Sequence, residues 1–167
     1  MPKVKWIFLQ EPLEFDENHQ FAIGSNAFVF YENGKFTSAG INLYEKKDSK
    51  PEVIASFDEV TFLGKWTEQK NEIKLIFENC RCQHCSEDHG EKMSKKQRSN
   101  PVPFSQNWKL ETGKFDQILL LKSDKKYRLV KESDYVFSNY NDLISEPLKI
   151  KNTEADEKCI AFDVEGL

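Results

Sequence analysis

Short β-prone runs, paired around tight turns, are the most regular pattern along the chain. In AFVFYENGKFTSAGINLY, residues 27–44, two such runs flank Asn33-Gly34, a dipeptide that supplies the positive φ angles of a tight hairpin turn. VTFLGKWTEQKNEIKLIFEN, residues 60–79, repeats this arrangement around a polar turn, and so does FDQILLLKSDKKYRLVKE, residues 115–132. The pattern therefore predicts three β-hairpins.

Alternation of apolar and polar residues marks the faces of these strands. Ile73, Leu75 and Phe77 alternate with polar neighbours, and a period of two is typical of a strand with one buried face. VKWIFL at residues 4–9 and PEVIASF at residues 51–57 are two further candidate strands. The total, roughly seven to nine short strands, predicts a mainly β fold: an antiparallel meander that forms a small barrel or half-barrel.

Helical signals are few, and they lie near the C-terminus. Ser133 predicts the cap of a short turn that runs to Tyr140. NDLISEPL predicts a short helix with Asn141 or Asp142 as its N-cap and with Pro147 ending it. One or two short helices are therefore expected beside the barrel.

A single domain is expected over residues 1–167, because this length supports one hydrophobic core and is short for two. The chain is 38% hydrophobic and has 13 phenylalanines, so the core should be aromatic. The strand pattern stops between residues 79 and 103, and long connections in compact domains are usually functional or disordered. We expect a long Cys/His-containing loop at 79–103, and a closing edge strand in CIAFDV, residues 159–164.

Charge and the N-terminal sequence exclude several classes of partner. The formal net charge of −4 gives no long-range attraction for phosphate backbones, so nucleic acid is not an expected partner. The apolar run Trp6–Leu9 is too short for a signal-peptide core or a membrane span. We therefore expect a cytoplasmic protein without a membrane partner.

CRCQHCSEDH, residues 80–89, carries the sharpest chemical signal. In a cytoplasmic chain the cysteines should be reduced, and Cys82 and Cys85 have the C-x-x-C spacing that lets two thiolates reach one tetrahedral zinc ion. Cys80 and His89 would complete a Cys₃His site. Four protein ligands leave no position open for substrate, so the zinc would be structural. His84 or Cys159 is an alternative fourth ligand.

Two other interpretations of this cluster remain open. A C-x-x-C pair lowers a thiol pKa when it opens a helix after a strand, which would make the cluster a redox site. It is equally compatible with a reduced loop that has no special chemistry. The sequence contains no Gly-rich phosphate loop, serine-nucleophile elbow or metal-binding His-Glu helix, so we predict that the protein is not an enzyme.

A family resemblance rests on the three hairpins taken in order. FVFYENGKFTSAG, FLGKWTEQKNEIKLIF and ILLLKSDKKYRLV together resemble the lipocalin-like β-meanders of small bacterial stress and envelope proteins. The resemblance implies a small β-barrel or half-barrel, a fold that hosts unrelated functions and so implies no activity. The matching residues are Phe30, Tyr31, Gly34, Phe36, Gly64, Trp66, Ile73 and Leu75.

These observations favour a binding protein that contacts another protein. A small acidic chain suits an immunity or inhibitor protein that neutralises a basic protein partner, because acidic surfaces steer and hold cationic ones. One alternative is a lipocalin-like carrier of a small apolar ligand, which requires an internal cavity of about 300 Å³ or more. The other is an interaction domain stabilised by zinc.

Overall fold

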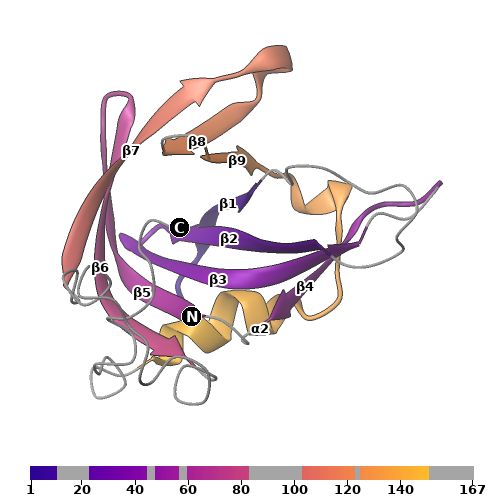
Figure 1. Cartoon of the computed structure of the whole chain (residues 1–167), viewed down its shortest axis with the longest axis horizontal. Coiled ribbons are helices and arrows are strands. Elements are labelled where there is room, and N and C mark those ends of the chain that lie inside the picture. The colour runs from indigo at the N-terminus through magenta and orange to yellow at the C-terminus, as the bar shows by residue number, and fades with distance from the viewer. Residues whose placement is uncertain (11–22, 45–47, 57–59, 83–102, 123–124, 151–167) are drawn as a thin grey trace, which may run out of the picture.

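The computed structural model describes residues 1–10, 23–44, 48–56, 60–82, 103–122 and 125–150 (Figure 1). This part of the chain is mainly β, as predicted. Its strands are β1 (Val4–Gln10), β2 (Ile23–Tyr31), β3 (Lys35–Tyr44), β4 (Glu52–Ser56), β5 (Val60–Gln69), β6 (Glu72–Cys82), β7 (Phe104–Thr112), β8 (Ile118–Lys122), β9 (Lys125–Leu129) and β10 (Val136–Phe137). Its helices are α2 (Tyr140–Ser145) and the 3₁₀ turns η2 (Lys114–Asp116), η3 (Glu132–Asp134) and η4 (Glu146–Lys149).

Eight of the strands close into an antiparallel barrel. The barrel closes at two places: β9 returns to β1, and β3 pairs with β5 through residues 35–38. The rest of β3, residues 40–44, turns away from β5 and pairs with β4, and β10 adds to β4 in parallel. The predicted small barrel is therefore confirmed in its closed form, with β4 and β10 as an extension outside it.

The three predicted hairpins are present as β2–β3, β5–β6 and β8–β9. In the first of them Gly34 has a φ of 85°, which glycine adopts without the steric penalty of a side chain. The Gly34 N–H donates to the Tyr31 carbonyl at 3.1 Å, and the Trp66 N–H donates to the Gly34 carbonyl at 2.9 Å. The Asn-Gly turn thus also fixes β5 against the hairpin.

Aromatic side chains fill the inside of the barrel. Phe28 lies at its centre, with ring centroids of Trp108 and Tyr127 each 5.0 Å away. A second group of rings continues toward β6, where the Phe36 and Phe77 centroids are 5.1 Å apart. A water-sized cavity would leave accessible surface on the side chains around it, yet these five side chains are 0% exposed. The described interior is therefore a packed core.

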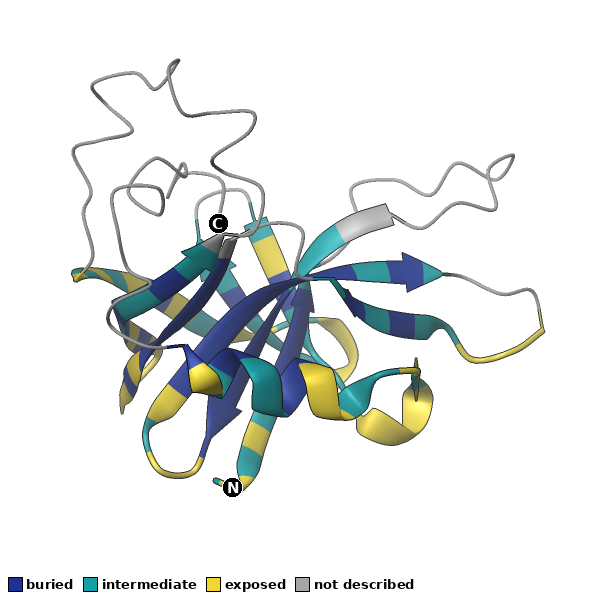
Figure 2. Cartoon of the chain, turned by 90° about the horizontal axis from the view of Figure 1, so that it is seen from below, coloured by how far each residue is buried: buried dark blue, intermediate teal, exposed yellow. Residues whose placement is uncertain are grey.

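A second core lies on the outer face of β1, β2 and β3, where α2 covers the sheet (Figure 1). Leu143 and Ile144 of the helix pack against outward-facing residues such as Val29 and Ile41. Figure 2 shows that the exposed and buried residues of this helix alternate above the buried strands. The Tyr31 hydroxyl crosses from the sheet to the helix and donates to the Ile144 carbonyl at 2.5 Å.

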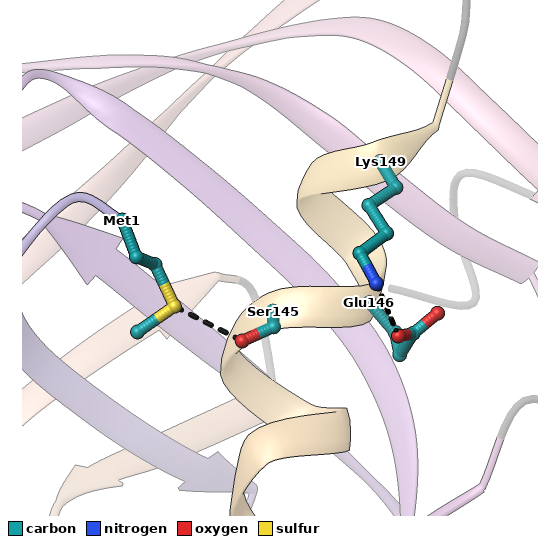
Figure 3. A network of polar contacts seen from close by, with 4 residues as sticks. All are labelled: Met1, Ser145, Glu146 and Lys149. Atoms are coloured by element: carbon teal, nitrogen blue, oxygen red, sulfur yellow. Dashed lines mark hydrogen bonds and ion pairs between the residues drawn. The ribbon is translucent and has the colours of Figure 1, made fainter.

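One polar contact joins the end of this helix to the N-terminal residue, and an ion pair lies within the turn that follows (Figure 3). The Ser145 hydroxyl donates to the Met1 sulfur at 2.9 Å, and the Lys149 ammonium donates to the Glu146 carboxylate at 2.7 Å. The ion pair lowers the pKa of the Glu146 carboxyl. Met1, ahead of β1, and the end of α2 are therefore neighbours.

The N-cap of α2 is Asn139, two or three residues before the predicted cap, and its side chain does not cap the helix. Its side-chain amide accepts from the Ala55 N–H at 2.7 Å and donates to the Ala55 carbonyl at 3.1 Å, so it docks on β4 instead of capping the helix. The α-helix ends at Ser145, two residues before Pro147, and the chain continues as the 3₁₀ turn η4 through Lys149. The turn predicted at Ser133 is η3, but β10 follows it before Tyr140.

The long connection predicted at 79–103 is shorter in the structure. β6 runs on to Cys82, so Cys80 and Cys82 are strand residues, and the chain is again a strand from Phe104. The intervening residues 83–102 lie outside the described part, as does the edge strand predicted at 159–164.

Candidate functional site

A cleft of about 700 Å³ lies where β9 leaves β1. The register pairs between these strands run from Phe8 to Gln10, and a bond from the Val130 N–H to the Ile7 carbonyl at 2.9 Å follows them. Beyond that bond β9 turns into η3, while β1 continues to Val4 beside β2. The cleft is the wedge between these diverging segments.

Apolar side chains from both cores form the floor of the cleft. Trp6, Ile118 and Leu129 pack against the inner core, while Val4 and Val130 pack against the outer one. The gap between β1 and β9 therefore reaches both sides of the sheet. A ligand seated here would bury apolar surface that the fold leaves partly exposed.

Trp6 is held rigidly on this floor. Its ring centroid lies 5.6 Å from that of Trp66 and 6.3 Å from that of Phe30. The Trp66 ring is itself fixed, because its Nε1–H donates to the Tyr31 carbonyl at 3.0 Å. The Lys5 ammonium lies 4.6 Å from the centre of the Trp6 ring and 5.4 Å from that of Trp66, within cation–π range.

Phe115 stands at the rim of the cleft, with 93% of its surface exposed. Phe115 and Asp116 have φ angles of 57° and 58°, which cost a non-glycine residue roughly 1–2 kcal/mol each. Bonds from the Gly113 N–H to the Gln117 carbonyl at 2.6 Å and from the Gln117 N–H to the Lys114 carbonyl at 3.3 Å hold the turn. An exposed aromatic ring on a strained turn points to a functional role.

Charged residues of both signs surround the opening. The wall made by η2 and η3 carries the carboxylates of Asp116, Glu132 and Asp134. Glu132 accepts from the Tyr140 hydroxyl at 2.6 Å, and burial together with this carboxylate raises the pKa of Tyr140. Within the described part of the chain, Asp116 and Asp134 form no ion pair. The cations of the lining are Lys5, Arg128 and Lys131.

The predicted zinc ligands lie at the opposite end of the barrel, or outside the described residues. Cys80 is fully buried in the inner core and is disulfide-bonded, so the expectation of reduced cysteines is wrong at this position. A disulfide sulfur provides no thiolate, and zinc binding by Cys80 would require its reduced form. Cys82 ends β6, whereas Cys85, His89 and the alternative ligands His84 and Cys159 are not described.

Among the residues that the structure describes, no group of three or more His, Cys, Asp or Glu side chains is arranged to hold a metal ion. The four-ligand site therefore stays a prediction. The cleft residues, by contrast, were not singled out as a site by the sequence. Trp6 was named only within the apolar run of a candidate strand, and no motif marks Phe115 as exposed or strained.

No known family model, curated protein or solved structure matches this chain. The resemblance to lipocalin-like proteins is therefore supported at the level of a closed antiparallel barrel and no further. In the described residues, no helix is long and apolar enough to cross a membrane.

Proposed function

We propose that this chain is a non-enzymatic binding protein, which neutralises a basic protein partner in the manner of an immunity or inhibitor protein. The observation that carries the proposal is the cleft beside β1, with its fixed apolar floor and the exposed ring of Phe115 at its rim. Rigid aromatic anchors and exposed apolar residues beside a polar rim are typical of protein interfaces.

Packing inside the barrel supports this choice over the carrier alternative. A lipocalin-like carrier needs an internal cavity, whereas Phe8, Phe28 and Trp108 are 0% exposed inside the described barrel. The cleft beside β1, by contrast, lies at the surface. An open surface cleft can hold a segment of another protein, whereas a carrier encloses its apolar ligand in an internal cavity.

The described residues do not share the net negative charge of the whole chain. Lys and Arg outnumber Asp and Glu in the described residues, so the net charge of −4 arises from the remaining segments. A uniformly acidic barrel surface is therefore not the basis for binding. The carboxylates at the rim of the cleft supply a local acidic wall in its place.

Affinity capture with the full chain tests the proposal. We expect wild-type protein to retain one basic partner from an extract of the source cells, and Phe115→Ser to lose it. Val136→Ser is the matched control, because Val136 is 45% exposed yet does not line the cleft. Titration calorimetry with the purified partner should then give one site per chain. Absence of a stoichiometric partner, or equal capture by Phe115→Ser, would overturn the proposal.

A further inference from the structure

We infer that the cleft takes an extended, basic and amphipathic segment of the partner, which adds to the edge of β1 as an extra strand. The inference rests on the proposed function and specifies how the partner is held. It depends on three observations in the cleft: a strand that extends beyond its neighbour, an apolar floor and an acidic opposite wall.

The strand edge provides main-chain pairing. Val4–Trp6 pairs with β2 on one side, while the register pairs to β9 on the other side begin only at Phe8. The cleft occupies the space beside these first residues of β1. An extended peptide placed there would bond to the strand edge, which is the common mode of β-augmentation.

The floor and the opposite wall specify the side chains of that segment. Alternate residues of an extended chain point to opposite faces, so every second side chain would meet the floor formed by Trp6, Ile118 and Leu129. The η2 and η3 wall offers Asp116 and Asp134, which have no ion pair among the described residues. Apolar side chains alternating with Lys or Arg complement both surfaces.

The cations of the lining do not cancel this acidic wall. Lys5 belongs to the β1 wall, and its ammonium lies over the rings of Trp6 and Trp66. Arg128 already has an interaction partner of its own. Lys131 offsets one of the three carboxylates on the η2 and η3 side, Asp116, Glu132 and Asp134, so that side keeps an excess of negative charge. This local excess on the η2 and η3 side is the charge that a basic segment would complement.

Three blocked hexapeptides test the inference on the full chain. Acetyl-(Lys-Val)₃-amide has the required pattern, (Glu-Val)₃ reverses its charge, and (Lys-Pro)₃ keeps the charge but removes the main-chain donor of every second residue and disfavours a regular strand. Titration calorimetry up to about 1 mM peptide reaches the weak affinity expected of a short probe. We expect (Lys-Val)₃ alone to bind, and to slow amide hydrogen exchange at Val4–Trp6.

A double variant tests whether the carboxylates of the η2 and η3 wall contribute to peptide binding. Asp116→Asn with Asp134→Asn should weaken (Lys-Val)₃ binding by about 3- to 10-fold, the range for two exposed ion pairs. The control is Asp142→Asn, an exposed carboxylate on α2 outside the cleft lining. Equal binding of (Glu-Val)₃ or (Lys-Pro)₃, no binding of any peptide, or an unaffected double variant would overturn the inference. If one of those peptide results is found but Phe115→Ser still loses the captured partner, only the strand-addition inference is wrong and the proposed function stands.

Discussion

Gly64 is the residue at which two barrel strands leave least room for a side chain. A Cβ built there would lie 1.9 Å from the Ile76 carbonyl oxygen and 2.7 Å from Cε1 of Phe36. We expect Gly64→Ala to lower the free energy of unfolding by about 3 kcal/mol or more, because backbone and a core ring must both move. Urea denaturation measures this difference.

Gly34→Ala is the matched control for that prediction. Gly34 has a φ of 85°, and the nearest atom to its Cβ would be 3.9 Å away, so its substitution strains the backbone without a clash. The expected cost is about 1–2 kcal/mol. Equal destabilisation by the two substitutions would show that the barrel accommodates a methyl group at Gly64.

Tyr31 makes the fold sensitive to alkali. Burial raises the pKa of its phenol from 10.0 to about 12, so the folded state favours the neutral form. The associated stability is present below pH 10 and is lost as the pH rises from 10 to 12, by about 3 kcal/mol in total. Unfolding free energies across this range, compared with Tyr31→Phe, measure the contribution.

Tyr31→Phe should show a shallower fall in stability with pH. Some dependence remains, because burial also raises the pKa values of Tyr127 and Tyr140. At neutral pH the variant should lose about 1 kcal/mol, since the Ile144 carbonyl is left without the hydroxyl that donates to it. Identical pH profiles for the two proteins would contradict the assignment.

Single residues were predicted well where alternation decides the face. Ile73, Leu75 and Phe77 were predicted to share one buried face of a strand, and all three lie in the inner core. The state of Cys80 was not predictable in the same way. Redox state was inferred from the expected compartment, whereas the disulfide depends on which sulfur the folded chain brings close to β6.

At the scale of elements, the short helix α2 depends on one buried face. Leu143 is 1% exposed and packs in the outer core. Leu143→Ala should lower the free energy of unfolding by about 2–5 kcal/mol, the usual cost of a large-to-small change in a core. Thermal or urea denaturation checks this value. Asp142→Ala is its control, because the neighbouring exposed residue should change stability by less than about 0.5 kcal/mol.

Hairpins were predicted more reliably than helix ends, for a physical reason. A hairpin is specified locally, by turn residues such as Asn33-Gly34 and by alternation on either side. The start of α2 depends on a distant partner, since Asn139 binds the backbone of Ala55 on β4. β10 has two residues and exists only because it pairs with β4, so no local pattern predicts it.

For the whole molecule, a packed barrel predicts that apolar ligands do not enter. Wild-type protein should not bind benzene or a fatty acid inside the barrel. Phe28→Ala should open a cavity that admits benzene, and should lower the free energy of unfolding by about 3–5 kcal/mol, since Phe28 is 0% exposed. Calorimetry and denaturation measure both effects, and Phe115→Ala is the control that removes an exposed ring. Stoichiometric fatty-acid binding by wild type would favour the carrier alternative.

Cys80 cannot form a disulfide and ligate zinc at the same time, because zinc binds the thiolate. We expect protein purified without reductant to contain no stoichiometric zinc, and to lose about 2–4 kcal/mol of stability when reductant is added. Cys80→Ala should not respond to reductant. Elemental analysis and urea denaturation give the two readouts. Stoichiometric zinc that disappears in Cys80→Ala would instead establish the metal site.

The barrel was predictable from the sequence, and the cleft was not. Strand number and turn spacing are local features that limit the architecture to a small antiparallel meander. The cleft combines β1 with the η2 turn and the segment after β9, and both of these are far from β1 in the chain. Its location depends on the residue at which β9 leaves β1, a property of the assembled sheet.

The pairing of β1 with β9 has a consequence for folding kinetics. Phe8 meets Leu129 across this seam, whereas the other strand pairs of the barrel join segments much nearer in sequence. Closing such a long loop costs more chain entropy, so the seam should form last and limit the folding rate. A partner strand that bridges β1 beside this seam would then slow unfolding, and the complex would gain lifetime as well as affinity.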